Sequence, residues 1–117
     1  MVDHEILLKK LQIYHFSSSA VNWFRSYLSN RTQSVKLNSI ISEELIIKTA
    51  VPQGSILGPL LFLLYVNDLH LHLTCSDLDM YADDSTLSVT DRSVAVTQNK
   101  VQSDLLKIEK WCVANNI

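Results

Sequence analysis

The stretch LDMYADDSTLSVT, residues 78–90, decides the fold that the sequence predicts for the second half of the chain. Leu78 and Met80 alternate with polar residues before the centre, and the alternation resumes after it, which predicts the two strands of a hairpin. Two adjacent carboxylates, Asp83 and Asp84, lie at the expected tip, where a turn relaxes the strict alternation of side chains. They can therefore face one cation together, and oxygen ligands of this kind suit Mg²⁺ or Mn²⁺.

The same residues allow two other interpretations. An Asp-rich centre between two strands is typical of a polar β-turn with no chemical role, and the tetrapeptide 81–84 taken alone favours that interpretation. An EF-hand loop numbered from Asp77 fails, because Ala82 stands where the loop needs Gly and Ser88 stands where it needs Glu.

The rest of the chain predicts helices and a second hairpin. Val35 and Leu37 alternate with polar residues, so residues 31–41 are expected to form a strand that turns at 42–44 and returns over 45–51. Residues 56–70 are apolar nearly all round, which indicates a buried helix. Further helices are expected at 3–14, with Asp3 as N-cap, at 18–29 and at 93–114. The order ααββαββα predicts an α+β fold, an antiparallel sheet with helices packed on one face.

Aromatic residues and cysteines mark the expected core. Trp23, Phe24 and Trp111 fall on apolar helical stripes and are expected to be buried. Cys75 and Cys112 are expected to be small core residues and not nucleophiles.

The glycines and prolines of the chain, two of each, all lie between Pro52 and Pro59. A strand ends here and a rigid turn leads into the expected helix, so Gln53 would stand just before a helix N-terminus, where free N–H groups favour negatively charged ligands. Gly54 would let a base or another chain approach the backbone. Taken alone, the window is explained most simply as a tight strand-to-helix connection. A P-loop is excluded, because no Gly-Lys-Ser/Thr follows.

Composition limits the function classes. The chain has 117 residues, 47% of them hydrophobic, and a net charge of −2. These values fit one globular domain and argue against a free-standing nucleic-acid binder, which is usually basic. The two cysteines lack any metal-ligand or CxxC spacing, which indicates a reducing compartment. No signal peptide or apolar run of membrane-spanning length occurs, so we expect an intracellular location, nuclear or cytoplasmic, and no membrane contact.

Two motifs in this order resemble a known family. The segment Val51 to Leu69, VPQGSILGPLLFLLYVNDL, followed by Tyr81-Ala82-Asp83-Asp84, resembles the palm of a reverse transcriptase. The resemblance is strongest to the enzymes of non-LTR (LINE-type, jockey-like) retrotransposons. Residues 2–11, 22–28 and 111–116 fit the same family, so the resemblance covers essentially the whole chain.

The resemblance implies an enzyme, an RNA-directed DNA polymerase that copies retrotransposon RNA into DNA by two-metal nucleotidyl transfer. Asp83 and Asp84 would be its catalytic residues and ligands of Mg²⁺ or Mn²⁺. An RNA template, a DNA primer and deoxynucleoside triphosphates would be the partners of the full-length enzyme.

Four further residues take nucleotide-binding or template-binding roles by the same resemblance. Gln53 and Gly54 would line the pocket for the incoming nucleotide and its template base. Tyr81 and Ala82 would place the aspartate pair near the primer end.

The resemblance also implies that parts of the enzyme lie outside these residues. The motif-A strand, with another metal-binding aspartate, would precede Met1, and the fingers and thumb would be missing. Residues 1–117 are therefore expected to be an incomplete, palm-like domain with an incomplete metal site, inactive alone and prone to self-association. The alternative function is a non-catalytic remnant of a mobile element, reused as a binding module or without function.

Overall fold

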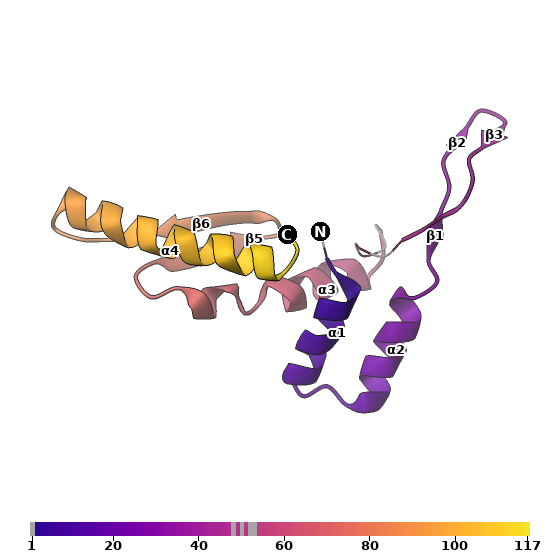
Figure 1. Ribbon diagram of the computed structural model, residues 1–117, viewed down its shortest axis with the longest axis horizontal. Helices are drawn as coiled ribbons and strands as arrows, with labels where there is room; N and C mark the ends of the chain where they lie inside the picture. Colours follow the sequence, from indigo (N-terminus) through magenta and orange to yellow (C-terminus); the bar gives the residue numbers. More distant parts are fainter. Residues whose placement is uncertain (1, 48, 50, 52–53) are drawn as a thin grey trace. The chain divides into compact units, whose positions relative to one another are not determined.

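The described residues form four α-helices, one 3-10 helix and three two-stranded antiparallel sheets (Figure 1). The structure is a computed structural model that describes residues 2–47, 49, 51 and 54–117. It divides into two compact units, residues 1–61 and 62–117. None of the helices among the described residues is long and apolar enough to cross a membrane.

The first unit begins with two helices that lie side by side, α1 (His4–Ile13) and α2 (Ser18–Leu28) (Figure 1). The predicted N-cap of α1 is confirmed, because the Asp3 carboxylate accepts hydrogen bonds from the N–H groups of Glu5 at 3.0 Å and Ile6 at 3.1 Å. The cap of α2 is Ser17, which accepts from Ala20 at 3.3 Å. The two helices bury six apolar side chains, those of Leu7, Leu8, Leu11, Val21, Phe24 and Leu28.

The first predicted hairpin is an interrupted ribbon. Its outgoing arm holds β1 (Thr32–Gln33) and β2 (Lys36–Leu37), and its return arm holds β3 (Ile40–Ile41) and β4 (Leu45–Ile46). β1 pairs with β4 and β2 pairs with β3, both antiparallel.

The prediction of a turn at 42–44 is wrong. The pairing of Leu37 with Ile40 leaves a two-residue loop, in which Asn38 has a φ of 54°. Asn tolerates this left-handed backbone, so the chain reverses there. The register then shifts by one residue, because two glutamates on the return arm oppose Ser34 alone, as in a β-bulge.

The helix α3 (Leu57–Val66) is shorter than predicted, and a 3-10 helix η1 (Leu69–His72) follows it. Asn67 and Asp68 separate the two, and both residue types form helices poorly. Pro59 lies in the first turn of α3, as its missing N–H requires. The prediction of burial all round is wrong, because Leu60 and Leu63 are 47% and 54% exposed.

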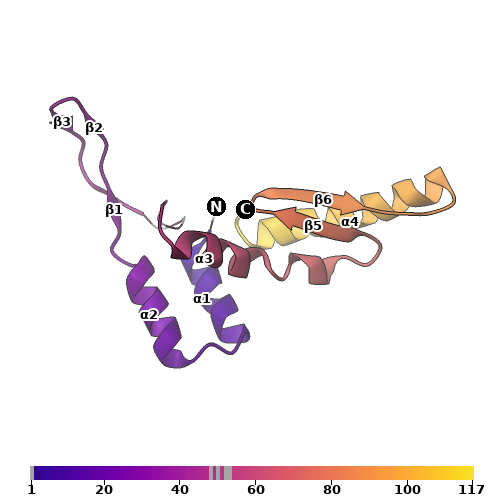
Figure 2. The same ribbon diagram turned by 180° about the vertical axis from the view of Figure 1, so that it is seen from behind.

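The second unit contains the other predicted hairpin, β5 (Asp77–Tyr81) with β6 (Asp84–Ser88), and the long helix α4 (Val94–Ala114). The helix runs alongside the hairpin in both Figure 1 and Figure 2. Trp111 on α4 and Tyr65 on α3 are buried, and the Tyr65 hydroxyl donates to the carbonyl of Asn115. The predicted range of this helix, 93–114, is confirmed with Ser93 as its N-cap.

Three of the five side chains that were predicted to lie in the core are not buried. Phe24 and Trp111 are buried as expected, but Trp23 is 54% exposed because its ring stacks on Tyr27 along the outside of α2. Cys75 is exposed and Cys112 is half-buried.

The α+β class is confirmed, but the order of elements differs from ααββαββα. Each arm of the first ribbon is divided into two short strands, and a 3-10 helix is added. The described strands form three separate pairs, so a palm-like sheet stays a prediction.

Candidate functional site

The candidate site is the end of the β5–β6 hairpin, where the predicted tip is confirmed. The register runs without a break from Asp77 opposite Ser88 to Tyr81 opposite Asp84. Ala82 and Asp83 therefore form a two-residue loop, and Asp84 begins β6. Both aspartates are exposed.

The hairpin has one polar face and one apolar face, because side chains alternate along each strand. Leu78, Met80 and Leu87 are half-buried, whereas Tyr81 and Asp84 are exposed. Residues directly opposite each other share a face. Tyr81, which is 85% exposed, and Asp84 therefore present their side chains on the polar face.

The loop holds a strained backbone. Ala82 has a φ of 53°, a left-handed conformation that costs an L-residue with a Cβ about 1 kcal/mol or more. The rest of the hairpin must supply this energy, and such strain often occurs where a loop has to present a side chain in a fixed direction.

The donor chemistry at the tip fits part of a magnesium site. The carboxylates of Asp83 and Asp84 make no hydrogen bond or ion pair with the described residues, so their oxygen lone pairs are available. Mg²⁺ requires six oxygen ligands, and two carboxylates supply only some of them. Within residues 2–47, 49, 51 and 54–117, no three His, Cys, Asp or Glu side chains converge on a point that could hold a metal ion. The expected incomplete site therefore stays a prediction.

The second predicted motif is described only in part. Pro52 and Gln53 lie outside the described residues. Gly54 is exposed with a φ of 74°, and a Cβ added there would meet no atom within 4 Å. Its backbone is therefore open to approach, as the sequence predicts, and its conformation favours glycine.

Sequence reasoning missed Asp104, a fully buried carboxylate on α4. It shares a helical stripe with Val101, Ile108 and Trp111, at the three-residue and four-residue steps of an apolar face. An acid on such a stripe is the signal that could have found it, because a buried carboxylate needs partners.

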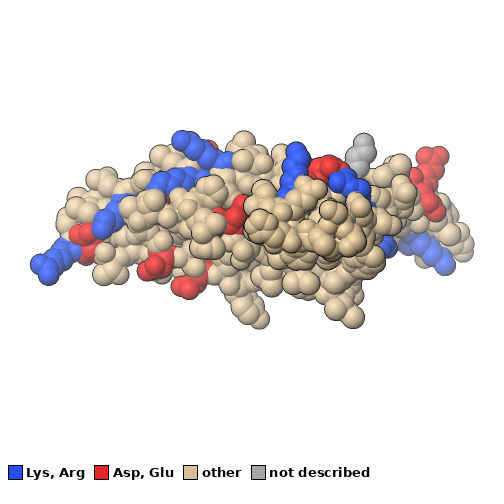
Figure 3. Space-filling view, turned by 90° about the horizontal axis from the view of Figure 1, so that it is seen from below, with Lys and Arg blue, Asp and Glu red and all other residues tan. Residues whose placement is uncertain are grey.

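Charges of both signs are interspersed on the face drawn in Figure 3. Three of the basic side chains in the described part of the chain pair with carboxylates: Arg25 with Glu5, Lys100 with Asp91 and Lys107 with Asp104. Pairing of this kind weakens the attraction of these cations for a phosphate backbone.

The family of the chain follows from a comparison with known protein families. The model of one family, described as reverse transcriptase (RNA-dependent DNA polymerase), matches residues 1–117. The chain belongs to the reverse transcriptase family. The family predicted from the two motifs is therefore confirmed.

Curated relatives from Drosophila melanogaster carry the same activity in their names. The RNA-directed DNA polymerase from mobile element jockey is 28% identical over 100 residues, which is 80% of this chain and 11% of the relative. The probable RNA-directed DNA polymerase from transposon X-element is 33% identical over 97 residues, which is again 80% of this chain and 11% of the relative. That from transposon BS is 29% identical over 118 residues, 95% of this chain and 13% of the relative. No solved structure matches this reverse transcriptase chain.

Proposed function

We propose that residues 1–117 form part of the palm of a retrotransposon RNA-directed DNA polymerase, with Asp83 and Asp84 at its nucleotidyl-transfer centre. One observation supports this proposal above the others: two carboxylates that have no partner among the described residues lie at the end of a regular hairpin, in a chain that matches the reverse transcriptase family throughout.

In the proposed reaction, the 3′-hydroxyl of a DNA primer attacks the α-phosphorus of a deoxynucleoside triphosphate. A new phosphodiester bond forms, the bond from the α-phosphorus to the bridging oxygen breaks, pyrophosphate leaves, and the proton of the 3′-hydroxyl passes to water. In phosphoryl transfer the protein chiefly positions the reactants and supplies charge. Asp83 and Asp84 would do so by holding a divalent cation, and bound Mg²⁺ would supply Lewis-acid stabilisation of the phosphoryl oxygens.

The neighbouring residues would position the nucleic acid. Tyr81 shares the exposed face of the hairpin with Asp84, so its ring could contact the primer end beside the carboxylates. Ala82 fixes the direction of the loop through its left-handed backbone. Gly54, with open space around it, and Gln53 would line the pocket for the incoming nucleotide and its template base.

The chain alone is proposed to be inactive. It corresponds to 11–13% of the length of the three relatives, and its described residues bring together too few ligands for a complete metal site. Misplacement by about 1 Å already costs about 100-fold in rate.

The test places this chain inside a complete polymerase. The matching segment of the jockey polymerase is replaced by residues 1–117, and RNA-templated primer extension is measured with Mg²⁺. We expect extension by this chimera, and a fall of about 100- to 1,000-fold in Asp83→Asn, because a charged group that acts in the transition state is lost.

The matched control is Asp77→Asn, which removes a carboxylate from the opposite end of the same hairpin. It should leave extension within about twofold, because a surface substitution away from the site has little effect. Equal loss in both variants, or an inactive chimera beside an active jockey polymerase, would favour the non-catalytic remnant.

A further inference from the structure

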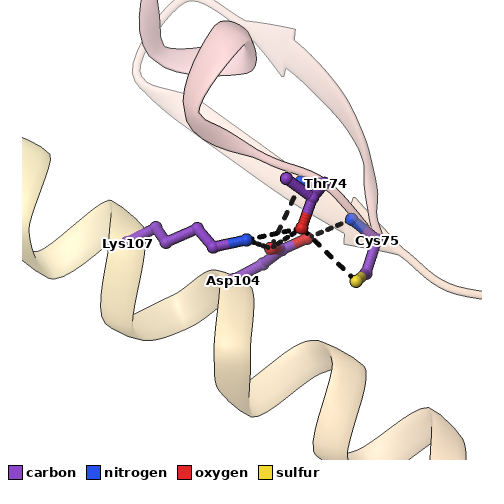
Figure 4. A network of polar contacts seen from close by, with 4 residues as sticks. All are labelled: Thr74, Cys75, Asp104 and Lys107. Atoms are coloured by element: carbon purple, nitrogen blue, oxygen red, sulfur yellow. Dashed lines mark hydrogen bonds and ion pairs between the residues drawn. The ribbon is translucent and has the colours of Figure 1, made fainter.

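A single buried carboxylate joins α4 to the start of the candidate hairpin (Figure 4). Asp104 accepts a hydrogen bond from the N–H of Cys75 at 2.9 Å and another from the N–H of Thr74 at 3.3 Å. Its other contacts are Lys107, whose ammonium lies 2.7 Å away, and the Thr74 hydroxyl. Lys107 also donates to that hydroxyl, so the four residues form one closed network.

The network joins parts of the chain that are far apart in sequence. Cys75 and Asp104 are 29 residues apart, yet two backbone N–H groups point at one side chain. The Asp104 side chain is fully buried, and a charge in that position is costly unless every partner is in place. Because ionised acceptors form the stronger hydrogen bonds, the geometry resists small shifts of residues 74–75 against α4.

Because of the position of these two N–H groups, the network affects the far end of the hairpin. Residues 74–75 come directly before β5, whose far end carries the loop with Asp83. From Cys75 to Tyr81 the chain advances by six residues, which is about 20 Å of extended backbone at ~3.3 Å per residue. A tilt of about 3° at the base would therefore move the tip by about 1 Å, which is the displacement that costs about 100-fold in rate.

We propose that Asp104 is a positioning residue, which fixes the base of the β5–β6 hairpin to α4 and so places Asp83 and Asp84. The functional half of this proposal rests on the proposed polymerase activity. The structural half, that Asp104 fixes the base of the hairpin to α4, does not rest on that activity. Each half is tested by a separate experiment.

A second acid–base pair on the same helix provides a matched control. Asp91, just before α4, pairs with Lys100 at 2.8 Å, and both side chains are partly exposed. It also accepts from the N–H of Ser93, its near neighbour in the sequence. It therefore resembles Asp104 in chemistry, but its hydrogen bonds to Ser93 and Lys100 stay within residues 91–100.

The first experiment measures backbone hydrogen exchange in the full 117-residue chain. In Asp104→Asn, amides of residues 77–88 should exchange about 10- to 100-fold faster, the effect of losing hydrogen bonds to a charged group. Amides of α1 and α2 should change less than twofold, and Asp91→Asn should leave both regions unchanged. Uniform acceleration over the whole chain would identify a general stabilising role and overturn the proposal, and so would no acceleration at 77–88.

If Asp104→Asn does not fold, a milder variant tests the same proposal. Lys107→Gln removes the ammonium but keeps Asp104 and the two backbone N–H groups. It should accelerate exchange over 77–88 by a few-fold, with α1 and α2 unchanged. Faster exchange confined to other segments would contradict the proposal that Asp104 fixes the hairpin to α4.

The second experiment uses the jockey chimera and reports on function. Asp104→Asn should lower kcat per competent enzyme by up to about 100-fold while KM for the nucleotide stays within about threefold, because the loss falls on positioning and not on substrate binding. If Asp83→Asn abolishes extension and Asp104→Asn does not change kcat, the positioning role is wrong and the proposed function stands. If neither variant changes extension while hydrogen exchange responds as expected, the proposed function fails and Asp104 is only an anchor.

Discussion

The two hairpins of this chain have very different regularity, although the same alternation of apolar and polar residues predicts both. The hairpin at 77–88 keeps one register from Asp77 to Asp84. The ribbon at 32–46 shifts register within its length and breaks into strands of two residues. The difference lies in what covers them: Leu78, Met80 and Leu87 are half-buried, whereas every strand residue of the ribbon is exposed.

The comparison teaches that alternation alone does not determine a register. A one-residue slip moves all apolar side chains to the opposite face, and this is costly only where one face is covered. In the ribbon, Leu37 and Ile40 share one face, but Ile41 lies on the other, and all three are at least 63% exposed. A slip there changes little buried area, so a bulge is tolerated.

The largest expected effect comes from removing the buried anchor of the second hairpin. Asp104→Asn should destabilise the second unit, residues 62–117, by about 3 kcal/mol at pH 7, while the unit that holds α1 and α2 changes little, because the variant breaks a buried, hydrogen-bonded ion pair. Burial alone would raise the pKa of Asp104, but hydrogen bonds from Lys107 and the Cys75 N–H hold the pKa well below its usual range.

This direction of shift sets the pH dependence of that effect. A carboxylate with a lowered pKa stabilises the fold fully above its ordinary value of 3.8, and the stabilisation is lost progressively as the pH falls from that value towards the lowered pKa of the folded state. Urea unfolding at pH 7, 5 and 3 should therefore show the difference between wild type and Asp104→Asn shrinking only below about pH 4. A difference independent of pH would show that the charge of Asp104 is not what stabilises the fold.

A matched pair of truncations tests the covered face directly. Leu87→Ala should cost about 1.5 kcal/mol, roughly half the loss for a fully buried leucine, because its side chain is half-buried. Leu37→Ala in the ribbon should cost less than about 0.5 kcal/mol, since Leu37 is 72% exposed. Equal midpoints in urea for the two variants would remove the proposed reason for the difference between the hairpins.

A smaller effect of opposite sign is expected in the loop of the second hairpin. Ala82→Gly should stabilise the chain by about 0.5–1 kcal/mol, because glycine adopts a φ of 53° without the clash of a Cβ. Thermal unfolding measures the gain. If the midpoint falls instead, the backbone of Ala82 is not strained.

The smallest effect is expected at the turn of the ribbon. Asn38→Gly should stabilise by only about 0.3 kcal/mol, because Asn already tolerates the φ of 54° at this position. Measured beside Ala82→Gly, it separates the cost of a left-handed alanine from that of a left-handed asparagine. A gain at Asn38 larger than that at Ala82 would reverse this ranking.

Local signals in the sequence predicted the features that depend on neighbouring residues. Asp3 begins α1 because a cap needs only the next few N–H groups, and Pro59 marks the first turn of α3 because a residue there needs no N–H partner within the helix. The turn at Asn38 was missed because Ser42 and the two glutamates after it are equally polar. Only the pairing of the arms distinguishes the loop from the bulge.

Features that depend on distant parts of the chain were harder to predict. The stripe of α2 correctly placed Phe24 inside, but periodicity does not say how far the covered face extends, and Trp23 proved to be exposed. At the candidate site, the positions of Asp83 and Asp84 followed from alternation. The contacts of Asp104 with Thr74 and Cys75 did not, because these residues lie 30 and 29 positions away.

The same separation has a consequence for how the protein is made. On the ribosome, residues 77–88 are synthesised before the residue that anchors them, and Asp104 follows Cys75 by 29 residues. The hairpin is complete at Ser88, 16 residues before Asp104, so at about 5–20 residues per second it spends roughly 0.8–3 s without its partner on α4. A lone hairpin is marginal in water, so during this interval its apolar face and open edges are available to chaperones or to another nascent chain. The order of synthesis thus leaves the segment with the aspartate pair exposed to misassembly until α4 is complete.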